Sequence, residues 1–244
     1  LIPSHGVGVW LRQQLASHQG ICAQVSTDFM GSFQWKLYSR ILKDQVSERA
    51  PLSASVMQWR LFAYLTDMHE NPDADGMLYA QLEPLFQKIK TQSTALQARR
   101  QIWYLAEQIA QVFAAYVVYR PEWLRLWGKG GQMDLRAEFA RIPIDDRPPE
   151  WQILRSIEMQ QWQAVLWRQL FAEVFESREA LMERFWQILA EEPARRRDLP
   201  RSIAVFGVVQ LPPAELMFLR RLAQYTNIQI FHYNPSQEYW ADSV

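Results

Sequence analysis

Hydrophobic and polar residues alternate in two different ways along this chain of 244 residues. Near both ends, short apolar runs stand between amphipathic segments, an order typical of strands that alternate with helices in a parallel sheet. Between residues 50 and 199, apolar residues recur almost only at helical spacing. The pattern therefore predicts an α/β layer, formed by residues 1–49 and 200–244, that is interrupted by a large all-helical subdomain.

The first part of the chain predicts two strands and two helices in alternation. Residues 1–2 read as the end of a buried strand, and residues 7–17 form a helix that Gly20 ends. Residues 21–25 predict a second short strand. A second helix follows, and its apolar face carries Phe33, Leu37, Ile41 and Leu42.

The middle of the chain predicts four amphipathic helices and one long loop. Residues 128–149 break the helical pattern with Gly130-Gly131 and Pro148-Pro149, so we predict an exposed loop there. The apolar residues of the four helices, in chain order, are Val56, Trp59, Phe62 and Leu65; Leu105, Ile109, Val112, Phe113 and Tyr116; Leu154, Ile157, Val165 and Leu170; and Leu181, Phe185, Ile188 and Leu189.

After residue 200 the strand pattern returns. Residues 203–206 and 228–231 predict two strands, and a helix between them carries Leu216, Leu219 and Leu222. Strands that are joined by helices in one sheet run parallel. We therefore expect residues 1–2, 22–25, 203–206 and 228–231 to form one largely parallel sheet.

The composition is that of a globular protein, with 49% hydrophobic and 21% charged residues. Lys and Arg (26) balance Asp and Glu (26), so nucleic acid would have to be bound by a local groove rather than by the overall charge. The single Cys22 fits a reducing, cytoplasmic location, and no apolar run approaches the ~20 residues that cross a membrane. The chain starts in mid-strand without Met, so we expect its true N-terminus to be missing.

No catalytic motif is visible. A P-loop needs Ser or Thr after its Lys, and the nearest segment, residues 128–131, lacks that residue and follows a helix. The four histidines show no metal-ligand spacing, and one cysteine cannot build a thiolate site. We predict no catalytic residue, no metal site and no cofactor in this chain.

Arginine and tryptophan side chains are the remaining candidates, because they neutralise phosphates and stack on bases. Residue type alone nevertheless favours helix faces and core packing for them. The candidates are Arg99, Arg100, Arg120, Arg178 and Arg195 to Arg197, with Trp10, Trp35 and Trp123.

Four segments, in collinear order over nearly the whole chain, resemble the RecC family, the gamma chain of exodeoxyribonuclease V. They are residues 2–11 (IPSHGVGVWL), 28–35 (DFMGSFQW), 116–124 (YVVYRPEWL) and 205–213 (VFGVVQLPP). The resemblance implies a degenerate superfamily 1 helicase-like fold, with a P-loop NTPase-like parallel sheet. A true helicase ends the strand at residues 203–210 in an Asp-Glu pair that holds magnesium, and this segment contains no carboxylate.

The resemblance also implies DNA-binding residues. Trp35, Arg120 and Arg178 match family positions in the channel that scans single-stranded DNA, while His5, Ser32 and Phe33 lie at turns that contact DNA in helicases. Two further channel positions carry Pro3 and Val9, whose side chains cannot form hydrogen bonds with a base. Recognition of the family's own hotspot sequence is therefore not implied.

By this resemblance the chain is a non-catalytic part of a bacterial, cytoplasmic RecBCD-type helicase-nuclease complex. Its partners would be RecB-type and RecD-type subunits in a heterotrimer, together with single-stranded and duplex-end DNA, and no membrane. The complex would act in recombinational repair of double-strand breaks. Two alternatives remain open: the helicase-nuclease subunit of an AddAB-type complex, and a purely structural helical adaptor.

Overall fold

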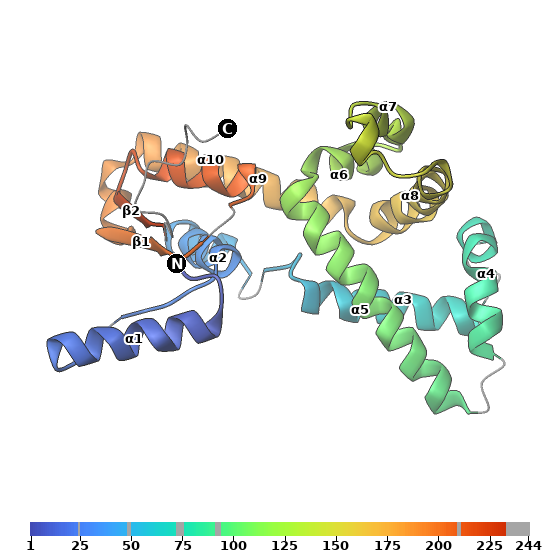
Figure 1. Cartoon of the computed structure of the whole chain (residues 1–244), viewed down its shortest axis with the longest axis horizontal. Helices are drawn as coiled ribbons and strands as arrows, with labels where there is room; N and C mark the ends of the chain where they lie inside the picture. The colour runs from blue at the N-terminus through green and yellow to red at the C-terminus, as the bar shows by residue number, and fades with distance from the viewer. Residues whose placement is uncertain (24, 48–49, 72–75, 91–93, 209–210, 233–244) are drawn as a thin grey trace. The chain divides into compact units, whose positions relative to one another are not determined.

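The computed structural model describes residues 1–23, 25–47, 50–71, 76–90, 94–208 and 211–232. These residues are mostly helical, with one sheet of two strands (Figure 1). They divide into two compact units: unit 1 contains residues 1–48 and 181–244, and unit 2 contains residues 49–180.

Unit 1 combines the sheet with helices from both ends of the chain. Helix α1 is capped at its N-terminus by Ser4, whose hydroxyl accepts a hydrogen bond from the Val7 amide (3.3 Å), and at its C-terminus by Gly20, whose φ of 78° is left-handed. The predicted stop at Gly20 is thus confirmed. The elements are α1 (His5–Gln19), α2 (Met30–Leu42), η1 (Lys43–Gln45), the end of α9 (Ala172–Glu191), η3 (Pro193–Asp198), β1 (Ser202–Phe206), α10 (Pro213–Leu222) and β2 (Asn227–Phe231).

The sheet of unit 1 is parallel, as predicted. β1 pairs with β2 in the register Ile203↔Ile228, and α10 makes the connection between them. Leu1 lies beside the other edge of β1, because its carbonyl accepts from the Phe206 amide (2.9 Å) and its amino group bonds to the Ala204 carbonyl. The two C-terminal strands are therefore confirmed, and Leu1 adjoins them.

The predicted strand at residues 21–25 is wrong for the residues that the structure describes. Residues 21–23 and 25 form no strand, while Gln24 lies outside the described residues. Ile21 is 71% exposed, so its apolar side chain is not part of a core. An apolar run becomes a strand only where a neighbouring strand supplies hydrogen bonds.

The core of unit 1 is aromatic. Tyr38 of α2 packs edge-on against Phe185 of α9 (centroids 5.0 Å apart) and against Phe218 of α10 (6.2 Å). The Trp186 ring also packs against Phe218, with centroids 5.2 Å apart. These contacts fix α2, α9 and α10 relative to one another behind the sheet.

Unit 2 is all-helical within its described residues. Phe113 lies at its centre and packs edge-on against Trp167 (5.4 Å) and Phe171 (5.9 Å). Its elements are α3 (Ala54–Glu70), α4 (Gly76–Lys90), α5 (Ala95–Tyr119), α6 (Pro121–Gly128), α7 (Leu135–Ala140), η2 (Ile144–Asp146), α8 (Glu150–Leu170) and the start of α9.

Several sequence predictions for unit 2 are wrong in detail. Trp59 was placed on an apolar face but is 63% exposed, and Val112 and Leu154 are exposed as well. The apolar residues of α3 fall on two adjacent stripes, and the structure buries the stripe of Met57, Leu61, Leu65 and Met68. The large ring of Trp59 therefore remains at the surface.

The predicted loop at residues 128–149 is also wrong, because it contains α7 and η2. Asp134 caps α7 by accepting a hydrogen bond from the Ala137 amide (3.1 Å), and Leu135 is buried. Arg147 closes the segment by donating to the carbonyls of Ala140 (2.7 Å) and Ile142 (3.1 Å). Side-chain hydrogen bonds thus order a segment whose glycines and prolines suggested a loop.

Candidate nucleic-acid interface

Arg120 stands at the sharp junction between α5 and α6. Its backbone amide donates to the Tyr116 carbonyl (2.8 Å), and Pro121 begins α6 at the first helical position, where no amide hydrogen is needed. The guanidinium donates to the Tyr119 carbonyl (2.9 Å) and lies 5.7 Å from the Trp123 ring. Arg120 is exposed, so its charge remains available to an anion.

A pocket of about 380 Å³ opens beside this junction, and we call it the Arg120 pocket. Residues from α5, α6, α7 and α8 line it, and Arg120 is the one charged side chain among them. The lining residues are Ala115, Tyr116, Tyr119, Arg120, Trp123, Trp127, Leu135, Phe139, Ser156, Met159, Gln160 and Gln163.

Two buried glutamines of α8 form the polar part of the Arg120 pocket. Gln160 accepts hydrogen bonds from the Trp127 indole (3.2 Å) and the Met133 amide (2.9 Å), and donates to the Met133 carbonyl (3.0 Å). Gln163 accepts from the Tyr116 hydroxyl (3.3 Å). Burial raises the pKa of the Tyr116 phenol, and the nearby Arg120 charge partly opposes this rise.

Arg178 lies half-buried on α9, in the same unit as Arg120. Its neighbour Glu179 receives three hydrogen bonds of 2.6 to 3.0 Å from the Arg125 guanidinium of α6. These bonds raise the pKa of Arg125 and tie α6 to α9. The ion pair therefore joins the helix that follows Arg120 to the helix that carries Arg178.

The other predicted site residues lie in unit 1. His5 is exposed and meets Phe29 edge-on at 4.8 Å, while Ser32 is exposed in the first turn of α2. Trp35 is only 8% exposed, and its indole donates to the Ser47 carbonyl (3.0 Å). No finding tests whether these residues bind DNA, so their roles stay predictions.

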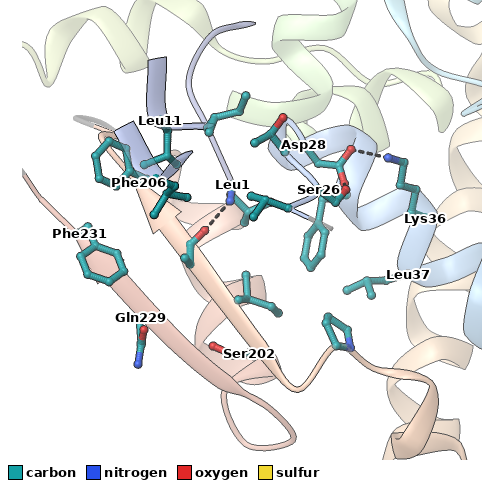
Figure 2. A pocket seen from close by; sticks show the side chains of 18 of the residues that line it. Leu1, Leu11, Ser26, Asp28, Lys36, Leu37, Ser202, Phe206, Gln229 and Phe231 are labelled. Carbon is teal, nitrogen blue, oxygen red and sulfur yellow. Dashed lines mark hydrogen bonds and ion pairs between the residues drawn. The ribbon is translucent and has the colours of Figure 1, made fainter. Parts of the chain in front are cut away.

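Phe33 lines a second cavity, of about 800 Å³, between α1, α2 and the sheet. Figure 2 shows Asp28, Ser26 and Lys36 on one side of it and the rings of Phe206 and Phe231 on the other. Asp28 forms an ion pair with Lys36, and the remaining lining is largely apolar. Lys36 and Arg40 are its cationic residues.

Sequence reasoning missed Gln163, Met159 and Trp127 of the Arg120 pocket. Apolar spacing gives no sign of a buried glutamine, and Met159 comes close only because α8 packs against the end of α5. The described residues contain no cluster of three or more His, Cys, Asp or Glu that could hold a metal ion. No helix in this described part is long and apolar enough to cross a membrane.

Comparison with known proteins shows the family. The family model described as RecC, N-terminal domain, matches residues 1–244. The RecBCD enzyme subunit RecC of Haemophilus influenzae is 30% identical over 251 residues, which cover 99% of this chain and 21% of that protein. The RecBCD enzyme subunit RecC of Escherichia coli is 26% identical over 248 residues, which cover 99% of this chain and 19% of that protein. The chain thus spans about a fifth of the length of these relatives, and it belongs to the RecC N-terminal domain family.

Proposed function

We propose that this chain is the DNA-contacting, non-catalytic N-terminal part of a RecC-type subunit. In a RecBCD-type complex it would guide single-stranded DNA and scan it for a recombination hotspot during double-strand break repair. Family membership supports the assembly, and the exposed Arg120 held over Trp123 at a pocket mouth carries the DNA contact. Arg provides charge and the ring provides a stacking surface, the two elements that single-strand binding uses.

For unit 1 we propose a partial helicase-like layer. Its support is the parallel pairing of β1 with β2 through α10, with Leu1 along the other edge of β1. β1 ends in Phe206 and continues into Gly207 and Val208, none of which has a side-chain oxygen that could coordinate magnesium. We therefore propose that this chain holds no nucleotide cofactor and neither binds nor hydrolyses ATP.

The proposed partners are RecB-type and RecD-type subunits in the cytoplasm, with single-stranded and duplex-end DNA. The similar proteins favour this over an AddAB-type helicase-nuclease subunit, since each of them is a RecC subunit of a RecBCD enzyme. A purely structural adaptor would use its arginines and tryptophans for protein contacts alone. Affinity for single strands distinguishes the adaptor from the proposed role.

The test replaces Arg120 or Arg178 by Ala in the full-length subunit, assembled with its partners. Arg155→Ala is the matched control, because Arg155 is an exposed arginine of α8 in the same unit. Loss of a phosphate contact weakens binding of every single-stranded sequence and reduces the slope of log affinity against log salt by about 0.7 to 1. If both variants bind DNA like Arg155→Ala, the proposed DNA contact is refuted and the adaptor role is favoured.

A further inference from the structure

We propose that the Arg120 pocket takes up one unstacked nucleobase from a single DNA strand, and that Gln163 reads the polar edge of that base. The inference rests on the proposed function and specifies what the site would bind. It is carried by three features of the pocket: its flat apolar walls, a buried amide with unused hydrogen-bonding capacity, and a single charge at its mouth.

The walls suit one flat ring system. The volume of about 380 Å³ lies near the lower end of ligand pockets, which span about 300–1,000 Å³. At the mouth, Tyr119 is 56% exposed and Met159 is 39% exposed, and Trp123 lies half-buried beneath Arg120. Aromatic rings and the polarisable thioether of Met both pack well against the face of a base.

Gln163 supplies the polar group that would read the base. Its side chain is only 5% exposed, and its one hydrogen bond joins its amide to the Tyr116 hydroxyl. Whichever way the amide is turned, its other polar atom has no hydrogen-bond partner among the described residues. Gln160, by contrast, uses both of its amide atoms in bonds to Trp127 and Met133. Gln163 lines the Arg120 pocket, so this amide atom can reach a base bound there, and a base edge offers complementary donors and acceptors.

The distribution of charge fits a nucleotide within a strand. Arg120 is the only charged residue in the lining, and it stands at the mouth, where it can neutralise a phosphate. The interior is uncharged, as a neutral base requires. The Ser156 hydroxyl already donates to the Gln152 carbonyl (2.8 Å), so Gln163 remains the main reading group. An aromatic side chain of a partner subunit is the rival occupant.

The experiment uses the assembled parent complex and a 15-mer of dT in which one abasic site is moved along the strand. We expect one abasic position to weaken binding, because only that base enters the pocket. Tyr119→Ala should weaken binding of the intact 15-mer by about 5- to 150-fold and remove the effect of the abasic position. Tyr104→Ala is the matched control, since Tyr104 is, like Tyr119, an exposed tyrosine of α5, but it does not line the pocket.

Gln163→Glu tests the reading group without removing the acceptor for Tyr116. The carboxylate cannot donate a hydrogen bond, so the order of affinity among dT, dC and dA 15-mers should change by about fivefold or more. If no abasic position weakens binding while Arg120→Ala does, the inference that the pocket binds a base is overturned, but the proposed function still holds. If Arg120→Ala also binds normally, the proposed function falls as well. If Tyr119→Ala impairs subunit assembly but not DNA binding, the pocket holds a protein side chain and the inference is overturned.

Discussion

Gln160 provides a direct test of how unit 2 is held together. Its amide joins three parts of the unit, because α8 carries it, Trp127 belongs to α6, and Met133 lies in the segment before α7. Replacement by Leu keeps a side chain of similar size but removes all three hydrogen bonds. The indole of the fully buried Trp127 and the amide of Met133 then lose their acceptor.

The expected loss of stability follows from these two donors. Each buried donor left without an acceptor costs about 1–3 kcal/mol, and the more apolar Leu side chain offsets about 1 kcal/mol of the total. We therefore expect Gln160→Leu to lower the free energy of unfolding of unit 2 by about 1–5 kcal/mol. Gln161→Leu, at the exposed neighbouring position, should change it by no more than about 0.5 kcal/mol.

Native-state hydrogen exchange of peptides from α6 and α8 is the suitable assay, because it reports unit 2 separately from unit 1. A single global transition need not apply to a chain with two units. If Gln160→Leu exchanges at the same rate as Gln161→Leu, the three hydrogen bonds do not stabilise the unit. The role given to Gln160 in the polar part of the Arg120 pocket would then be wrong.

Two further predictions concern charged residues. Burial raises the pKa of the Glu215 carboxyl in the folded state, so the stability that this group contributes is greatest below its unfolded pKa of about 4.3 and is lost as pH rises through the folded pKa. Glu215→Gln should therefore raise Tm at pH 7 and leave Tm at pH 3 unchanged. An equal rise of Tm at both pH values would contradict this. Arg125→Ala breaks the ion pair with Glu179 and should destabilise unit 2 by about 0.2–1 kcal/mol, because both side chains are partly exposed. The loss of stability caused by Arg125→Ala should be smaller in 1 M salt, because salt screens the ion pair. A loss that does not depend on salt would show that packing, rather than charge, is responsible.

The parts of the fold that sequence predicts well have strong local signals. Residues 203–206 and 228–231 are short runs of mostly β-branched and aromatic residues, and both form strands. Gly20 ends α1 because it adopts a left-handed conformation that other residues rarely take. In each case the information lies within a few residues of the element.

The parts that sequence predicts poorly depend on distant partners. Residues 21–25 have the apolar character of a strand, but no strand lies beside the described ones. The buried Gln163 accepts a hydrogen bond from the Tyr116 hydroxyl, which lies 47 positions earlier in the chain. The sequence indicated Arg120 and Trp123 separately, and only the turn at Pro121 brings the guanidinium over the ring.

Trp35 shows how burial changes the weight given to a predicted site residue. A base stacks on a ring that has an open face, and the side chain of Trp35 is packed against Tyr38 (6.0 Å) and bonded to the Ser47 carbonyl. In this conformation Trp35 stabilises the end of α2. Phe33, two positions earlier, is half-buried and lines the large cavity, where Lys36 is paired with Asp28. Within unit 1, the physical argument for stacking a base is therefore stronger at Phe33 than at Trp35.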